Sequence, residues 1–168
     1  MLRYMRFFKF TSSLLYFIIC CLSCQSPTTN EYAETSGEWT LTALTKVDEV
    51  NPIMMPTGSS FFLCPIRQEE VRWEVKDVFN PAVIVRNGKV YMLYRAEDSV
   101  GRYNGTSRIG LAISEDGLHF EKQPDPVLYP EDDFMKIYEW EGGIEDPRVV
   151  ETEDGRYIMT YTAYDGET

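Results

Sequence analysis

Two adjacent carboxylates, a proline and an arginine stand together in residues 142–148, whose sequence is Gly-Gly-Ile-Glu-Asp-Pro-Arg. A carboxylic acid can donate a proton to a reacting group, so Asp146 is a candidate acid catalyst. Proline fixes its own φ at about −65° and favours an extended residue before it, which predicts a stiff backbone at Asp146. The two glycines are expected to leave room for a substrate. The alternative is ordinary turn chemistry, in which Arg148 neutralises Glu145.

The same arrangement occurs a second time, earlier in the chain. Asn80-Pro81 precedes an apolar run, an Asn-Gly turn and a second apolar run, and Asp146-Pro147 precedes the same pattern with an Asp-Gly turn. The offset is 66 residues up to the turn, and one inserted residue aligns the rest. Because Asn-Gly readily adopts the positive φ of a tight turn, residues 82–85 and 90–96 form a predicted hairpin.

Hairpins that repeat without helices between them predict an all-β radial array. A β-propeller has this form, because each blade is a four-stranded sheet with one strand facing the axis. Asn80 and Asp146 then occupy equivalent points of neighbouring blades and face one cavity. Further strands are predicted at residues 39–47, 61–66, 71–78 and 108–113, with loops at 51–60 and 98–106.

Other reactive side chains predict structure more than chemistry. His119 is the only histidine and lies on the arm of a predicted hairpin without a Cys or His partner, so the sequence has no metal-ligand spacing. Cys64 lies among apolar residues and is expected to be a buried small hydrophobe. Tyr138 and Trp140, close to the carboxylates, form either a sugar platform or part of the core.

The first residues have the pattern of an exported protein. Residues 1–24 carry basic residues and then an apolar run well short of the roughly 20 residues that span a bilayer, which predicts a signal peptide. Cys24 follows a small residue and resembles the acylated cysteine of a bacterial lipoprotein box, so we expect a lipid anchor there. Residues 25–37 predict a polar linker, and residues 38–168 a partial catalytic domain. The expected location is the bacterial cell envelope, either periplasm or outer membrane.

The charge of the chain limits its partners. With a formal net charge of −11, the protein repels nucleic acid and anionic membranes, so we expect no nucleic acid and no membrane contact beyond the lipid anchor. An anionic substrate requires a local basic cluster. The hydrophobic content of 43% is enough for a packed core.

Three stretches resemble glycoside hydrolase family 130. They are Asn80-Pro81 with Tyr-Arg-Ala-Glu-Asp at 94–98, Ser-Arg-Ile-Gly-Leu-Ala at 107–112 with Asp-Gly at 116–117, and Gly-Ile-Glu-Asp-Pro-Arg at 143–148. The resemblance covers residues 58–168 and implies a five-bladed β-propeller that acts on β-mannosides by phosphorolysis or hydrolysis. Only about the first two blades are detectable, so we expect an N-terminal fragment that is inactive alone.

The resemblance also implies roles for single residues. It implies that Asp146 is the general acid, which in the phosphorylases acts through a hydroxyl of the mannosyl ring. Candidate substrate-binding residues in the matched stretches are Asn80, Arg95, Arg108, Glu145 and Arg148. The negative charge of Glu145 is expected to raise the pKa of Asp146, and Arg148 to oppose this. No metal or cofactor is implied, although a phosphorylase takes inorganic phosphate as co-substrate.

The expected reaction is cleavage of a β-mannosidic bond with inversion, with phosphate or water as the attacking group. These residues leave the choice between the two open. Export favours hydrolysis, because a sugar phosphate released outside the cytoplasm loses the benefit of its stored bond. Two alternatives remain: a non-catalytic propeller that binds glycans at the cell surface, and a glycosidase of the same fold with another sugar specificity.

Overall fold

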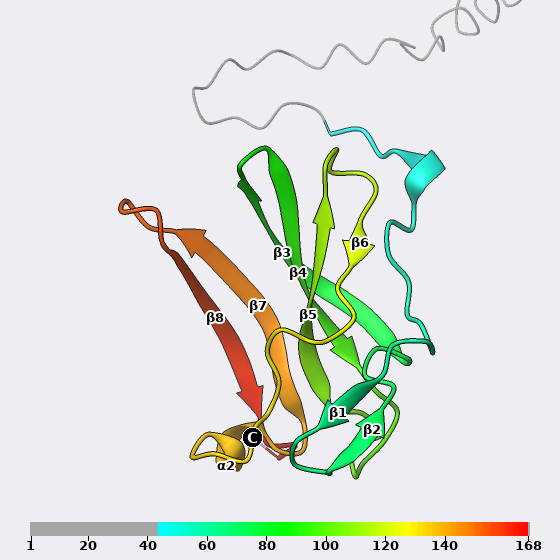
Figure 1. Ribbon diagram of the computed structural model, residues 1–168, viewed down its shortest axis with the longest axis vertical. Coiled ribbons are helices and arrows are strands. Elements are labelled where there is room, and N and C mark those ends of the chain that lie inside the picture. Colours follow the sequence, from blue (N-terminus) through cyan, green and yellow to red (C-terminus); the bar gives the residue numbers. More distant parts are fainter. Residues whose placement is uncertain (1–43, 168) are drawn as a thin grey trace, which may run out of the picture. The chain divides into compact units, whose positions relative to one another are not determined.

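The computed structural model describes residues 44–167 (Figure 1). Contacts within the chain divide it into residues 1–46 and residues 47–168, and every strand described below lies in residues 47–168. The predicted signal peptide, linker, lipidated Cys24 and most of the predicted strand at 39–47 lie outside the described residues. Residues 44–47 form no strand, and a short 3-10 helix, η1 (Asp48–Val50), follows them. Within the described part, no helix has the length and apolarity needed to cross a bilayer.

The described chain is almost entirely strand and loop, which confirms the all-β class. The strands are β1 (Phe62–Cys64), β2 (Glu69–Val71), β3 (Asp77–Arg86), β4 (Lys89–Glu97), β5 (Ser107–Ser114), β6 (Glu121–Lys122), β7 (Gly143–Glu151) and β8 (Tyr157–Tyr164). One short helix, α2 (Lys136–Glu139), lies between β6 and β7. This helix corrects the expectation that no helix separates the repeated hairpins.

Strands β3 to β6 form one antiparallel unit of four strands, as a propeller blade does. The predicted hairpin joins β3 to β4, where Arg86 pairs with Lys89 around the turn. Asn87 and Gly88 have φ values of 51° and 78°, the left-handed conformation that a two-residue hairpin turn requires. The Asn-Gly signal in the sequence therefore predicted this turn correctly.

Strands β7 and β8 begin a second unit that repeats β3 and β4 (Figure 1). Both hairpins have an irregularity in their register at the same place, between Phe79 and Ala82 in β3 and between Glu145 and Arg148 in β7. The internal repeat is thus confirmed down to the backbone. Closure of such units into five blades stays a prediction.

The backbone at Asp146 differs from the sequence-based expectation. Its φ is 49°, and that of Asn80 is 47°, so both residues are left-handed where an extended residue was predicted. The irregularity in each strand decides this, because an extra residue in one strand must leave the regular ladder. Asp and Asn are among the residues that tolerate this conformation best.

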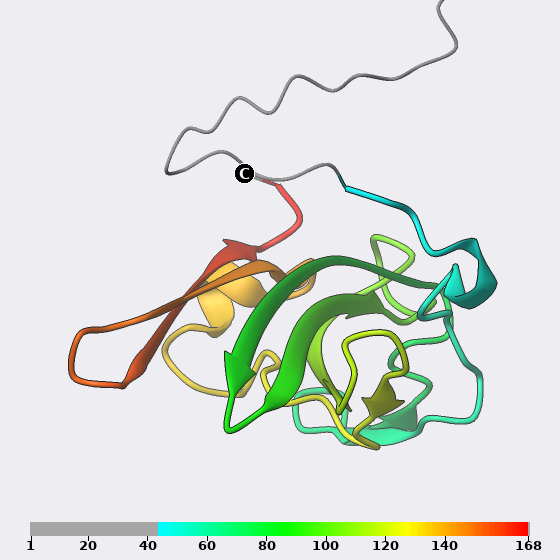
Figure 2. The same ribbon diagram turned by 90° about the horizontal axis from the view of Figure 1, so that it is seen from above.

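The four-stranded unit of β3 to β6 (green to yellow) and the β7–β8 hairpin (orange to red) lie side by side (Figure 2). They meet where β5 and β7 run parallel and Ser107 pairs with Gly143. A Cβ atom added to Gly143 would lie 2.3 Å from the backbone nitrogen and oxygen of Ser107. One added to Gly142 would lie 2.4 Å from the ring of Tyr164. The glycines therefore allow strands to approach each other, and the expectation that they leave room for a substrate is wrong.

The predicted strand at 71–78 is also wrong, because the chain turns after Val71 and β3 begins at Asp77. The turn buries Trp73 and Glu74 completely. The buried carboxylate of Glu74 is stabilised by an ion pair of 2.7 Å with Lys122 and by a hydrogen bond from the Tyr94 hydroxyl. A tertiary network, invisible in local alternation, therefore determines this segment.

The core lies between the β1–β2 hairpin and the four-stranded unit of β3 to β6. Its buried members are Phe62, Cys64, Val71, Trp73, Tyr94, Ala96 and Ala112. Cys64 is 1% exposed, as its apolar neighbours predicted. His119 is exposed and lies 2.7 Å from Asp116 in the β5–β6 turn, in agreement with a structural role.

Candidate active site

Arg95, on β4, is the centre of a group of carboxylates. Its Nη2 lies 2.6 Å from Glu97 Oε1 and 2.7 Å from Glu145 Oε1. Its Nη1 lies 3.3 Å from Asp146 Oδ1. The guanidinium has a fixed planar fork of donors, so it can hold several acids in one geometry. Two strands, β4 and β7, thus bring Arg95, Glu97, Glu145 and Asp146 to one point, which we call the Arg95 cluster.

Asn80 joins the cluster from β3. Its side-chain nitrogen donates a hydrogen bond of 2.6 Å to Asp146 Oδ1. Both residues occupy the irregular position of their hairpin and share the left-handed backbone described above. The prediction that Asn80 and Asp146 occupy equivalent points of the two repeats is therefore confirmed, whereas the central cavity that both were expected to face stays a prediction.

Ser107, the first residue of β5, contacts both Arg95 and the carboxylates of the cluster. Arg95 Nε donates to Ser107 Oγ over 3.0 Å. The same hydroxyl lies 3.2 Å from Glu97 Oε1 and 3.3 Å from Glu145 Oε1. It has one proton, so it can donate to only one of these acids at a time.

Lys76 and Phe79 make two further contacts with side chains of the cluster. Lys76 Nζ forms an ion pair of 2.8 Å with Glu97 Oε2. The ring of Phe79 lies under the guanidinium of Arg95, with 4.5 Å between the ring centroid and Cζ. The cation–π contact and the ion pair both restrict the side chains that surround Asp146.

The carboxyls of Glu145 and Asp146 have pKa values shifted in opposite directions. The hydrogen bond from Asn80 holds the pKa of Asp146 below its ordinary value, and Arg95 acts in the same direction. Burial raises the pKa of Glu145 and outweighs the charge of Arg95. The expected rise in the pKa of Asp146 is thus absent from this structure, because the hydrogen bonds from Asn80 and Arg95 outweigh burial, and the like charge of the pair acts on the pKa of Glu145 instead.

Glu97 is a second ionised acid of the cluster, beside Asp146. Burial alone would raise its pKa, but hydrogen bonds from Lys76 and Arg95 hold the pKa below the ordinary value. Glu97 therefore serves as a fixed negative charge, while Glu145 is the carboxyl of the cluster that most readily keeps a proton.

Arg108 does not join the cluster. Successive side chains of a strand alternate between faces, so Arg108 points away from its neighbour Ser107. Its side chain is 1% exposed, and its Nη1 lies 2.7 Å from Asp98 Oδ2. It also donates to the carbonyl of Thr106 and lies over the ring of Phe62. The structure therefore places this candidate in the core, where it holds the β4–β5 loop.

Arg148 lies next to the cluster but outside its hydrogen bonds. Its Nη1 donates to the carbonyl of Pro147, and the residue is exposed. Its charge contributes to the lowered pKa of Asp146, as the sequence predicted. The side chain is free of carboxylate partners among the described residues and faces solvent.

Sequence reasoning missed Glu97, Ser107 and Lys76. Glu97 stands two residues after Arg95, and this spacing places both on one face of a strand, so the signal was present. Ser107 lies one residue before the predicted strand at 108–113, and only the register that opposes it to Glu97 reveals its contact. Lys76 was assigned to a strand that does not form.

The described residues contain no group of three or more Cys, His, Asp or Glu side chains arranged to hold a metal ion. The acids of the Arg95 cluster form ion pairs with Arg95 and Lys76. The cluster thus presents carboxyl groups, an amide and a guanidinium, which suit the hydroxyls of a sugar.

A family model described as beta-1,4-mannooligosaccharide phosphorylase matches residues 45–168. The chain belongs to glycoside hydrolase family 130. It is 39% identical over 113 residues to Beta-1,2-mannobiose phosphorylase from Thermoanaerobacter sp. (strain X514), covering 62% of this chain and 35% of the relative. It is 36% identical over 118 residues to 1,2-beta-oligomannan phosphorylase of the same organism, covering 67% and 33%. The chain thus spans about a third of the length of these relatives.

Solved structures resemble the chain as well. A glycosyl hydrolase from Bacteroides ovatus is 42% identical, with a TM-score of 0.73, covering 79% of this chain and 37% of that one. A second structure represents the glycoside hydrolases of the family that target beta-1,2 mannosidic linkages in Candida mannan. It is 43% identical, with a TM-score of 0.72, covering 78% and 37%. The named relatives of this chain therefore include both phosphorylases and hydrolases.

Proposed function

We propose that the full-length protein in which these residues lie cleaves β-mannosidic bonds with inversion. The observation that carries this proposal is the Arg95 cluster, in which Asn80 and Asp146 meet at equivalent points of two repeats. The names of the relatives support β-mannosides as the substrate class. Because the chain spans about a third of those relatives, activity and substrate are proposed for the full-length protein only.

Asp146 is the proposed general acid. It gives its proton to a hydroxyl of the mannosyl ring, and that hydroxyl passes its own proton to the glycosidic oxygen. The bond between this oxygen and the anomeric carbon breaks, while the new bond forms from the opposite face, either to phosphate or to a water that gives up a proton to a second carboxylate of the full-length protein. Asn80 and Arg95 bind the hydroxyls of the same ring.

The low pKa of Asp146 in the free protein must rise before it can act as an acid. Its first cause is the hydrogen bond from Asn80. In our proposal the bound sugar takes over the Asn80 amide and excludes water from the carboxyl, and both changes raise the pKa. The alkaline limb of kcat then lies at higher pH than that of kcat/KM, because the two limbs report the bound and the free enzyme. Coinciding limbs would contradict this step.

The attacking group is decided by product analysis. The full-length protein is incubated with β-1,2- and β-1,4-linked manno-oligosaccharides, with and without inorganic phosphate. Mannose 1-phosphate that forms only with phosphate identifies a phosphorylase, and free mannose in both conditions identifies a hydrolase. Binding without turnover in either condition refutes catalysis and favours a glycan-binding propeller.

Export to the cell envelope and a lipid anchor at Cys24 complete the proposal. They rest on the sequence of residues 1–24, which precede the described part of the chain. Cys24→Ala is expected to abolish incorporation of labelled palmitate and to release the protein from the membrane fraction. Equal membrane association of both forms would contradict the anchor.

A further inference from the structure

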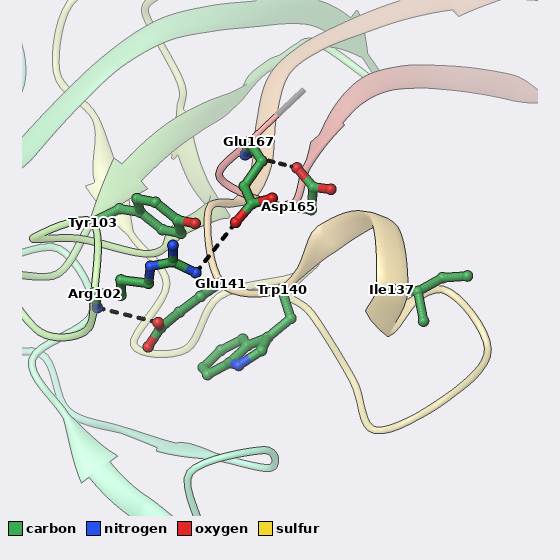
Figure 3. A pocket seen from close by; sticks show the side chains of 7 residues that line it. All are labelled: Arg102, Tyr103, Ile137, Trp140, Glu141, Asp165 and Glu167. Atoms are coloured by element: carbon green, nitrogen blue, oxygen red, sulfur yellow. Dashed lines mark hydrogen bonds and ion pairs between the residues drawn. The ribbon is translucent and has the colours of Figure 1, made fainter.

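A hollow of about 290 Å³ lies at one end of the second hairpin, apart from the Arg95 cluster (Figure 3). Three segments line it: the β4–β5 loop, the residues before β7 and the residues after β8. They contribute Arg102, Tyr103, Trp140, Glu141, Asp165 and Glu167. None of these residues has a role in the proposed reaction.

The hollow is connected to the cluster through β7. Ser107, whose hydroxyl contacts Arg95, donates its backbone N–H to the carbonyl of Gly142 over 2.8 Å. Glu141 lines the hollow and stands four residues before Glu145, so their Cα atoms lie at most about 14 Å apart. The hollow is therefore near enough for a longer oligosaccharide held at the cluster to extend toward it.

The floor of the hollow is fixed. Glu141 pairs through one oxygen with Arg67, and its other oxygen accepts the backbone N–H of Arg102 over 3.1 Å. The guanidinium of Arg67 also lies over the ring of Trp140, 4.9 Å from its centroid. Trp140 packs against the core on the same side, so the tryptophan is both part of the core and part of the lining. Tyr138, the other predicted platform residue, is absent from the lining.

The rim of the hollow can exchange its contacts for a ligand. Arg102 and Glu167 form an ion pair of 3.3 Å, with side chains 68% and 65% exposed, and pairs of this kind contribute little stability. Figure 3 shows the Tyr103 hydroxyl directed toward Glu167 and Asp165. Three carboxylates of the lining stand against two guanidinium groups, those of Arg102 and of Arg67 below Glu141, so the excess negative charge disfavours an anion such as phosphate.

We propose that this hollow is a subsite for a neutral sugar ring of the glycan, farther along the same oligosaccharide than the ring held by the Arg95 cluster. The carboxylates and the Tyr103 hydroxyl bind sugar hydroxyls, and the aromatic rings offer apolar faces to the ring. The proposal rests on the proposed function, because the ligand is the same glycan. It gives the site a preference for chains longer than a disaccharide.

The test compares short and long substrates in the full-length protein. Tyr103→Phe removes one hydroxyl and keeps the ring, and Glu167→Gln removes one charge at the rim. Each is expected to lower kcat/KM for mannotetraose by about tenfold, the value of one hydrogen bond, while kcat/KM for mannobiose changes less than twofold. Asp154→Asn is the matched control, because Asp154 forms a similar exposed ion pair with Arg156 away from the hollow.

Equal loss on both substrates, or no loss on either, overturns the subsite while the proposed function stands. If the wild type cleaves no manno-oligosaccharide, the proposed function fails, and calorimetry with mannotetraose decides the subsite alone. Binding that weakens about tenfold in Tyr103→Phe and is unchanged in Asp154→Asn supports it. Absent binding, or binding that neither variant changes, overturns it.

Discussion

The choice of Asp146 over Glu145 as the acid can be tested by removing one charge at a time. Asp146→Asn keeps an oxygen that accepts from Asn80 and Arg95, at the present distances of 2.6 and 3.3 Å. Glu145→Gln likewise keeps an oxygen for Arg95 at 2.7 Å. Both variants preserve the shape of the cluster, so a difference in their activity reports the proton and not the geometry.

The expected losses differ strongly. A general acid contributes about 10²- to 10⁴-fold, so Asp146→Asn should lower kcat by this factor while KM changes little. Glu145→Gln only weakens a charge-assisted hydrogen bond, and a loss of about 1 kcal/mol corresponds to roughly fivefold. Each variant should unfold within about 1 kcal/mol of the wild type, as measured by urea denaturation.

The assay follows product formation from manno-oligosaccharides in the full-length protein. An aryl mannoside with an acidic leaving group provides a second readout, because such a group departs without a proton and should restore turnover in Asp146→Asn. The reasoning is refuted if Asp146→Asn retains more than a tenth of the activity. It is also refuted if Glu145→Gln is the more damaged variant, because the carboxyl with the raised pKa would then be the proton source.

Three other predictions concern the fold. Arg108→Met should cost about 3–5 kcal/mol in urea denaturation, because it leaves a buried carboxylate unpaired, whereas the exposed Arg148→Ala should cost less than about 0.5 kcal/mol. Gly143→Ala should cost at least about 1–3 kcal/mol more than Gly155→Ala, since both have positive φ but only the former meets the backbone of β5. Burial raises the pKa of Glu139, so its contribution to stability is fully present below the ordinary value of 4.5 and is lost as pH rises through the folded pKa. Glu139→Gln should therefore flatten the decline of melting temperature above pH 4.5, and an unchanged slope would contradict the burial argument.

The sequence predicted the parts of the fold that local chemistry decides. The Asn-Gly pair at 87–88 forms the expected turn, and the match between Asn80-Pro81 and Asp146-Pro147 identified two equivalent hairpins. Repeats are detectable in a sequence because each copy must satisfy the same backbone geometry. The irregular position itself was missed, since proline alone favours an extended residue before it.

The failures share a different cause. Glu74 and Lys76 alternate with apolar residues as a strand does, yet Glu74 is buried by partners far away in the sequence. Arg108 lies in a matched stretch, but the phase of β5 turns it toward Asp98 and away from the cluster. A shift of one residue in phase moves a side chain to the other face of a sheet, and no local pattern fixes that phase.

The Arg95 cluster follows from applying one backbone device twice with different side chains. The irregularity of β3 presents an amide at Asn80, and the equivalent point of β7 presents a carboxyl at Asp146. A carboxyl at both points would repel its copy, and an amide at both would lack an acid. The difference of a single functional group therefore converts a structural repeat into a donor facing an acid, with Arg95 between the strands to hold them. If proton transfer depends on this pair, kcat for manno-oligosaccharides should fall more in Asn80→Asp, which adds a charge, than in Asn80→Ala, which removes a contact. An equal or larger loss of kcat in Asn80→Ala would contradict this argument.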